Sequence, residues 1–151
     1  MPHYNFNKDL PMAIQSEKEV AQLLTRLFNA TILNSNNNNN KYDILAIIKG
    51  KNVTFEVKED FTCERTNNVG LEFECRGKAS GVNVSQADYY VHKLHTKKYG
   101  IIFVMQSAKS IKAKIADKKY FRIVNGGDVD SNSMNYLFKY DEFVAGGYFL
   151  K

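Results

Sequence analysis

The stretch YDILAIIKGKNVTFEVK, residues 42–58, decides the fold expected for this chain. Residues 42–48 form a largely apolar run rich in β-branched side chains, and residues 53–58 alternate apolar with polar side chains. The segment between them, residues 49–52, combines a glycine with polar residues, which is a turn signal. The stretch therefore predicts a β-hairpin.

Three charged side chains fall at the open end of this hairpin. If Gly50 and Lys51 form a two-residue loop, residue 49 faces residue 52, Asp43 faces Lys58, and Glu56 lies one step diagonally away on the same face. Opposed Cβ atoms in such a pair are about 5 Å apart and diagonal ones about 7–8 Å. The sequence thus predicts a cluster of two carboxylates and one ammonium.

Such a cluster suits a hard cation. Magnesium typically takes one or two protein carboxylates, several waters and substrate phosphate oxygens. A lysine beside the metal can orient the attacking water and offset negative charge that develops on a phosphodiester. The alternative is that Asp43 merely begins a strand, while Glu56 and Lys58 form a solvated ion pair on the polar face of a hairpin.

Tyr42-Asp43-Ile44 followed by Glu56-Val57-Lys58 resembles the signature of the PD-(D/E)xK nuclease superfamily, in particular its small Holliday-junction-resolvase-like and phage members. Tyr42 replaces the proline that names the motif. The resemblance covers the chain from residue 16 to residue 106. It implies that Asp43, Glu56 and the Val57 carbonyl bind Mg²⁺, for which Mn²⁺ can substitute, and that Lys58 assists the attacking water.

The activity implied by this resemblance is metal-dependent hydrolysis of DNA. The enzyme would be a structure-selective endonuclease or a phage DNA-processing nuclease, and a homodimer is one expectation for a small resolvase. Two alternatives stay open. The chain could be a catalytically inactive nucleic-acid-binding domain that keeps the nuclease fold, or an unrelated α/β protein whose hairpin charges are simply solvated.

The segment 16–29 predicts the first helix. Its apolar residues recur at helical spacing, and Ser16 with Glu19 forms a capping-box pattern at its start. Glu17 falls on the apolar stripe, where a charge needs a partner. The resemblance implies a glutamate on the first helix close to the metal, and Glu17 is the candidate. The alternative is an ordinary acid in the first turn of a helix.

The segment 85–94 predicts a second amphipathic helix that begins at Ser85. Gln86 and Tyr90 stand four residues apart, which resembles the Gln-x-x-x-Tyr motif of RecB-like and phage exonucleases. In those proteins the pair supports the active site or contacts the nucleic acid. The alternative assigns Gln86 to an ordinary first turn and Tyr90 to the core.

The rest of the chain completes an α/β pattern. We expect a strand at 71–75, a buried strand at 100–105, a helix at 108–118 and a strand-like piece at 136–140. The asparagine-rich segment 34–40 is expected to be a flexible connection. The expected architecture is one domain, residues 1–151, with a restriction-endonuclease-like core: a central mixed sheet flanked by helices.

The net charge is +5, and the basic residues concentrate in one region: residues 93–122 contain nine Lys or Arg and one acid. A region of this kind can hold a polyanion such as DNA. The expected DNA contacts are Arg76 and Lys78, in a glycine-containing loop, and Lys112 and Lys114, on the expected helix at 108–118. The alternative is that these cations solvate a turn and an outer helix face.

Composition narrows the remaining classes of protein. No apolar run approaches the roughly 20 residues of a membrane span, and the N-terminal residues carry no signal-peptide pattern. We therefore expect no membrane partner and a cytoplasmic protein, in the host cytoplasm if the gene is carried by a phage. Cys63 and Cys75 are expected to be free thiols. Their spacing fits no compact zinc motif, even with His92 and His95 added.

Overall fold

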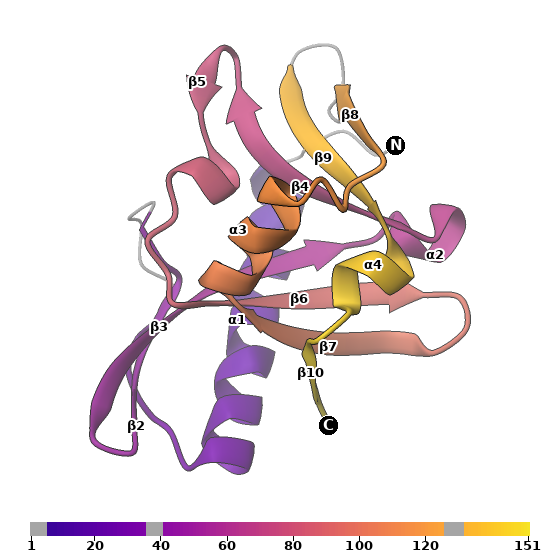
Figure 1. Cartoon of the computed structure of the whole chain (residues 1–151). Helices are drawn as coiled ribbons and strands as arrows, with labels where there is room; N and C mark the ends of the chain where they lie inside the picture. The colour runs from indigo at the N-terminus through magenta and orange to yellow at the C-terminus, as the bar shows by residue number, and fades with distance from the viewer. Residues whose placement is uncertain (1–5, 36–40, 126–131) are drawn as a thin grey trace.

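The computed structural model describes residues 6–35, 41–125 and 132–151, with side chains from residue 11 onward (Figure 1). Its centre is a mixed six-stranded sheet in the order β1-β2-β3-β6-β7-β10. These strands are β1 (Thr31–Ser35), β2 (Ile44–Ile48), β3 (Lys51–Asp60), β6 (Tyr89–Thr96), β7 (Gly100–Ser107) and β10 (Tyr148–Leu150). Helices flank this sheet, which confirms the expected α/β class. Most of the asparagine-rich segment, residues 36–40, lies outside the described residues.

The predicted hairpin is present as β2 and β3, but its turn is Lys49-Gly50 and pairs Ile48 with Lys51. Both turn residues have positive φ, 51° and 76°, as a type I′ turn requires. The expected loop is therefore wrong by one residue. Continued beyond Ile44, the observed register sets Asp43 opposite Glu56 rather than opposite Lys58. The pairing moves by two residues, so the three charged side chains keep a common face.

A second, four-stranded sheet lies above the central one in Figure 1, in the order β5-β4-β9-β8. Its strands are β4 (Asn68–Cys75), β5 (Lys78–Ala79), β8 (Arg122–Asn125) and β9 (Ser133–Lys139). The expected strand at 71–75 is thus present as part of β4, which belongs to this second sheet and not to the sheet of the hairpin. The chain leaves the central sheet through the short helix α2 (Cys63–Thr66), where the Asp60 carboxylate accepts hydrogen bonds from the Thr62 and Cys63 amides.

One face of the central sheet is covered by helix α1 (Phe6–Phe28). Val20 and Leu24 are fully buried and pack in one core with Ile44, Phe55 and Val91. The helix begins ten residues before the expected start at Ser16, and Pro11 lies inside it. The capping box is therefore wrong. Ser16 is a buried residue within the helix, and Glu19 pairs with Lys93 across the helix–sheet interface.

The segment 85–94 is the second correction, because it contains strand β6 and no helix. Six of the eight β6 residues are buried, on both faces of the strand. A strand covered on both sides loses the alternation that normally marks it. Apolar residues at 87, 90, 91 and 94 then fit a helical period equally well. Tertiary burial, which the local pattern does not contain, decides between the two.

The opposite face of the central sheet packs against the second sheet and two helices, α3 (Ala108–Ala116) and α4 (Tyr140–Val144). Their shared core includes Tyr90, Leu94, Val104, Phe138 and Phe143. Helix α3 confirms the expected helix, with its end at residue 116. Strand β7 confirms the expected strand at 100–105, although Ile101 is 54% exposed and the strand is not buried throughout. Among the described residues, no helix is long and apolar enough to cross a membrane.

Candidate functional site

Asp43 lies just before β2 and is held in place by the backbone of β3. Its amide donates to the Phe55 carbonyl at 2.8 Å, and its Oδ2 accepts from the Val57 amide, also at 2.8 Å. These two bonds straddle Glu56, so that the Asp43 and Glu56 carboxyl groups lie side by side and within hydrogen-bonding reach. Glu56 itself is buried, with 8% of its surface exposed.

Burial and the neighbouring Glu56 charge raise the pKa of Asp43 from 3.8 to about 7. Burial disfavours the ionised form, and a second carboxylate at this distance disfavours it further. Asp43 therefore tends to keep its proton up to near-neutral pH. A divalent cation between the two groups would replace that proton and remove the repulsion between the carboxylates. Strongly shifted pKa values of this kind cluster at functional sites.

Lys58 extends from β3 on the same face, with its Nζ 3.4 Å from Glu56 Oε2. Burial favours its neutral form, but the attraction of Glu56 and Asp43 outweighs burial and raises the pKa of Lys58. The side chain as a whole is 46% exposed and borders the pocket. His92, the β6 residue aligned with Lys58, is buried, and burial lowers its pKa to about 3. It adds no positive charge to the site at neutral pH.

A pocket of about 280 Å³ opens over Glu56 and Lys58. Its other wall is the segment 79–85, which contains β5 in part, the 3₁₀ helix η1 (Gly81–Asn83) and the serines Ser80 and Ser85. Gly81 is required here. It has φ of +51°, and a Cβ at this position would lie 2.1 Å from the Glu72 carbonyl oxygen. Only glycine lets this wall approach β4 so closely.

Ser85 is the residue of this wall that reaches the carboxylate pair. Its hydroxyl donates to Glu56 Oε1 at 3.0 Å. Tyr90 lies behind it on β6, aligned with Glu56. Burial raises the pKa of the Tyr90 phenol, and its hydrogen bond with Ser85 opposes that rise. Sequence reasoning gave Ser85 only a capping role in a helix that does not form. A serine just before a buried strand carries no local signal of a contact with Glu56.

Val57 contributes its backbone at the same place. An extended residue points its N–H and its C=O to the same side of the strand. Because the Val57 amide donates to Asp43 Oδ2, the Val57 carbonyl also points to the side of β3 on which Asp43 lies. A metal role for this carbonyl stays a prediction.

The two remaining candidates for the site differ in their placement. Glu17 lies on α1 with its Oε2 buried, and its role near a metal stays a prediction. Gln86 has an exposed side chain in the segment before β6, and its amide donates to the Lys41 carbonyl at 2.7 Å. Gln86 and Tyr90 are therefore not neighbours on a helix face. Of the two, Tyr90 lies beside Glu56.

The expected DNA contacts also differ from one another. Arg76, Lys78 and Lys112 are exposed, and their role stays a prediction. Lys114 is different, because its Nζ donates to Gln106 Oε1 and to the Phe143 and Ala145 carbonyls, each at 2.6 Å. Its three N–H groups are all used inside the protein. Burial also lowers the pKa of Lys114. Lys114 as a phosphate contact stays a prediction, which these internal bonds disfavour.

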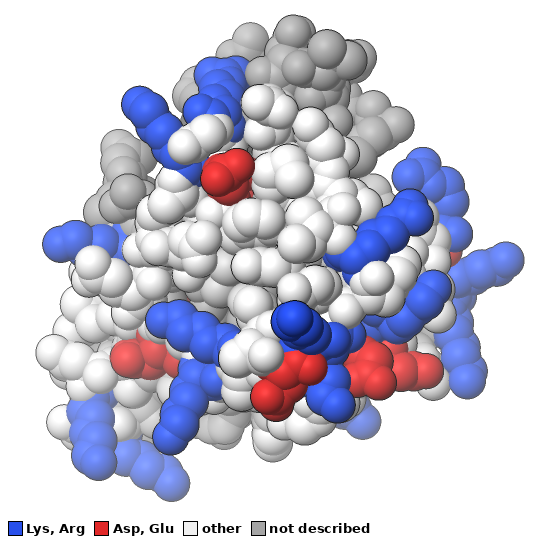
Figure 2. Space-filling model, turned by 45° about the horizontal axis from the view of Figure 1, so that its top comes forward, with Lys and Arg blue, Asp and Glu red and all other residues white. Residues whose placement is uncertain are grey.

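The positive charge does not gather into one patch on the face drawn in Figure 2. Lys and Arg side chains lie mostly around its margin and leave a broad centre without them.

The described residues do not support a zinc site. Cys63 and Cys75 are free thiols, and no group of three His, Cys, Asp or Glu side chains in the described part of the chain is arranged to hold a metal. A cation at the Asp43–Glu56 pair would need water or phosphate oxygens to complete its coordination shell.

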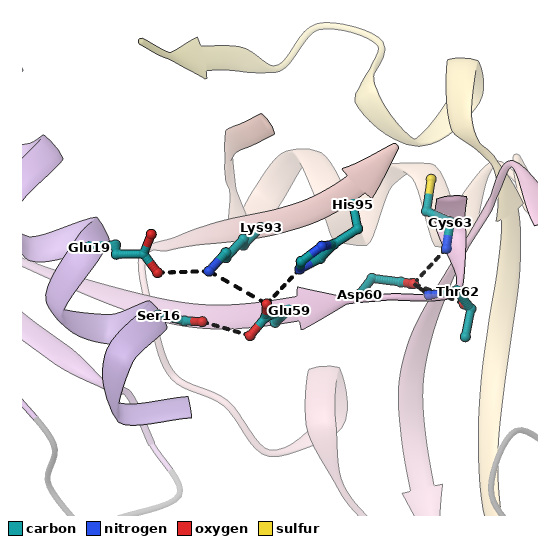
Figure 3. A network of polar contacts seen from close by, with 8 residues as sticks. All are labelled: Ser16, Glu19, Glu59, Asp60, Thr62, Cys63, Lys93 and His95. Carbon is teal, nitrogen blue, oxygen red and sulfur yellow. Dashed lines mark hydrogen bonds and ion pairs between the residues drawn. The ribbon is translucent and has the colours of Figure 1, made fainter. Parts of the chain in front are cut away.

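A second polar cluster occupies the other face of β3, under α1 (Figure 3). Glu59 accepts a hydrogen bond from Ser16 at 2.7 Å, contacts His95 Nε2 at 2.6 Å and faces Lys93 Nζ at 3.5 Å. Lys93 in turn pairs with Glu19 at 2.7 Å. Each carboxylate of this cluster has a cationic or hydroxyl partner, so the cluster ties α1 to β3 and β6.

The sequence matches no protein-family model and no curated protein. Among solved structures, the fold is similar to that of a bacterial homing endonuclease, I-Ssp6803I, with a TM-score of 0.46 and 15% sequence identity over 68% of this chain and 69% of that chain. A likeness of this extent carries no argument about activity. The function is therefore inferred from the geometry of the Asp43–Glu56–Lys58 site.

Proposed function

We propose that this protein is a metal-dependent nuclease that hydrolyses phosphodiester bonds in DNA, with a PD-(D/E)xK-type site at Asp43, Glu56 and Lys58. The observation that carries the proposal is the pair of adjacent carboxyl groups, Asp43 and Glu56, beside an ammonium at the wall of an open pocket. A purely structural hairpin would gain nothing from burying two carboxyl groups against each other.

The donor set fits Mg²⁺ or Mn²⁺. Asp43 and Glu56 supply carboxylate oxygens, and the Val57 carbonyl lies on the side of β3 that faces Asp43. Oxygen ligands of this kind suit hard cations, which complete their shell with water and substrate phosphate. A bound Mg²⁺ would polarise the phosphodiester and lower the pKa of a bound water.

Lys58 holds its proton firmly, because Glu56 and Asp43 raise its pKa. It is therefore an electrostatic group and not a general base at neutral pH. Its ammonium can orient the attacking water or offset charge on the phosphate, while Glu56 keeps it near the proposed metal ligands. Arg76, Lys78 and Lys112 are the proposed contacts to the DNA backbone, and Glu17 is a further candidate near the metal.

The test is cleavage of fluorescent DNA substrates: single strand, duplex, flap and four-way junction. Each is incubated with Mg²⁺, Mn²⁺ or EDTA, and Asp43→Asn serves as the control variant. We expect metal-dependent cleavage that the variant loses, because an amide cannot replace a carboxylate in binding a hard cation. The preferred substrate then separates a junction-resolving endonuclease from a DNA-processing nuclease.

Two outcomes would contradict the proposal. Salt-sensitive DNA binding without cleavage in any metal would identify a nucleic-acid-binding domain that keeps the fold. Cleavage that survives both EDTA and Asp43→Asn would place the activity elsewhere or in a contaminant.

A further inference from the structure

We propose that Ser85 is a positioning residue that fixes Glu56 in the orientation needed to bind the cation. This inference rests on the proposed function and extends it to a residue outside the three-residue motif. Ser85 Oγ donates to Glu56 Oε1 at 3.0 Å and lies 3.2 Å from the Lys41 carbonyl, two residues before Asp43. One hydroxyl thus contacts both chain segments that carry the carboxylate pair.

The surroundings of Ser85 direct its hydroxyl hydrogen toward Glu56. A serine hydroxyl has one donor and two acceptor positions. The Ala87 amide donates to Ser85 Oγ at 3.3 Å, and the Tyr90 phenol is within hydrogen-bonding reach. The Lys41 carbonyl already accepts from the Gln86 amide at 2.7 Å, and a hydrogen bond to a carboxylate is stronger than one to a carbonyl, so the single hydroxyl hydrogen is best used for Glu56. This hydrogen bond holds the Glu56 carboxylate against the pocket wall.

The backbone around Ser85 is itself held rigidly. The Gln86 amide donates to the Lys41 carbonyl at 2.7 Å, and the Ser85 amide donates to the Gly81 carbonyl at 3.0 Å. Gly81 packs directly on the Glu72 backbone, and the Ser80 amide donates to the Phe73 carbonyl at 3.0 Å. The pocket wall 79–85 is therefore anchored at both ends, and Ser85 offers Glu56 a fixed partner. Partners of this kind orient metal ligands, and their loss typically weakens metal affinity.

The experiment measures Mn²⁺ affinity of the DNA-free protein by electron paramagnetic resonance, at one pH, for wild type and three variants. We expect Ser85→Ala to weaken Mn²⁺ binding by roughly 10- to 100-fold. Ser85→Thr keeps the hydroxyl and should restore most of the affinity. Ser80→Ala removes a hydroxyl from the same pocket wall, but one that contacts Glu72, and should bind Mn²⁺ as wild type does. Thermal unfolding of each variant shows that it is folded.

Unchanged Mn²⁺ affinity in folded Ser85→Ala, or an equal loss in Ser80→Ala, would overturn the inference while leaving the proposed function intact. A wild-type protein that binds no Mn²⁺ and cuts no DNA would overturn both.

Discussion

The two faces of strand β3 hold carboxylates in opposite situations. Glu59, under α1, has Ser16, His95 and Lys93 as partners. Glu56, three residues earlier and on the other face, contacts Lys58 and the Ser85 hydroxyl but also lies against a second carboxyl group, that of Asp43. Burial and Glu56 together raise the pKa of Asp43 to about 7. The first arrangement satisfies its charges and stabilises the fold. The second keeps two carboxyl groups together in a pocket, where a bound cation would remove their repulsion.

The comparison predicts that the same substitution has opposite consequences on the two faces. Glu56→Gln removes a proposed ligand, so DNA cleavage should fall by at least about 100-fold, the upper end of the loss caused by removing a partner one step further from the metal. In metal-free buffer at pH 8, where Asp43 is mostly ionised, the folded protein should keep or gain stability, because the variant no longer buries two like charges. Cleavage rate and thermal unfolding in EDTA measure the two effects. Unchanged cleavage in a folded variant would place the chemistry elsewhere.

Glu59→Gln should behave in the opposite way. The side chain is 12% exposed, and its loss of charge leaves Lys93 with Glu19 as its carboxylate partner and weakens the contact with His95. Removing one member of a buried ionic cluster should cost roughly 3 kcal/mol, the low end for such a loss because Lys93 keeps Glu19, and this is a fall in Tm of about 6–12 °C for a chain of this length. Cleavage per folded molecule, measured well below Tm, should stay near wild type. A large loss of cleavage with little loss of stability would give the α1 face a functional role.

This contrast also separates what the sequence could predict from what it could not. The sequence was sufficient to predict the cluster of Asp43, Glu56 and Lys58, because a hairpin is a local structure. Two apolar strands and a glycine turn place the three charges on one face, even when the predicted turn is wrong by one residue. The sequence predicted the strand at 100–105 and the helix at 108–118 for the same reason. Local periodicity was sufficient for each of these elements.

Elements and contacts that depend on residues far apart in the chain could not be predicted from local sequence patterns. Residues 85–94 satisfy a helical period, but the parallel pairing of β6 with β3 makes the segment a strand. Ser16 and Glu19 fit a capping box, yet they contact Glu59 and Lys93 far along the chain. Ser85 was missed because its contact with Glu56 depends on the same pairing, which no short pattern encodes.

The pH dependence of stability sharpens the comparison further. Asp43 has a pKa of about 7 in the folded protein and 3.8 as a free side chain. Between these values the unfolded chain has lost a proton that the folded protein keeps, so the free energy of unfolding falls as pH rises and levels off above about pH 7. Asp43→Asn should remove this loss, which we expect to be about 1 kcal/mol or more.

Denaturant unfolding at pH 4.5 and pH 8, in EDTA, measures this effect as the difference between wild type and Asp43→Asn. The difference cancels the titration of groups common to both proteins. Adding Mn²⁺ at pH 8 should restore the stability of the wild type alone, because a ligand that binds the folded state stabilises it by mass action. Equal pH profiles for the two proteins would show that Asp43 titrates normally.

The smallest expected effect tests the same distinction, between satisfied and available charge, on helix α3. Lys114 uses its three N–H groups inside the protein, whereas Lys112 is exposed. Lys112→Ala should weaken DNA binding a few-fold and flatten its salt slope by up to about 0.9, the value for one lost phosphate contact. Lys114→Met should leave the slope unchanged. Fluorescence anisotropy over a salt series, in an Asp43→Asn background that does not cut the probe, measures both. If Lys114→Met flattens the slope and Lys112→Ala does not, internal hydrogen bonding is no guide to which cations of this protein meet DNA.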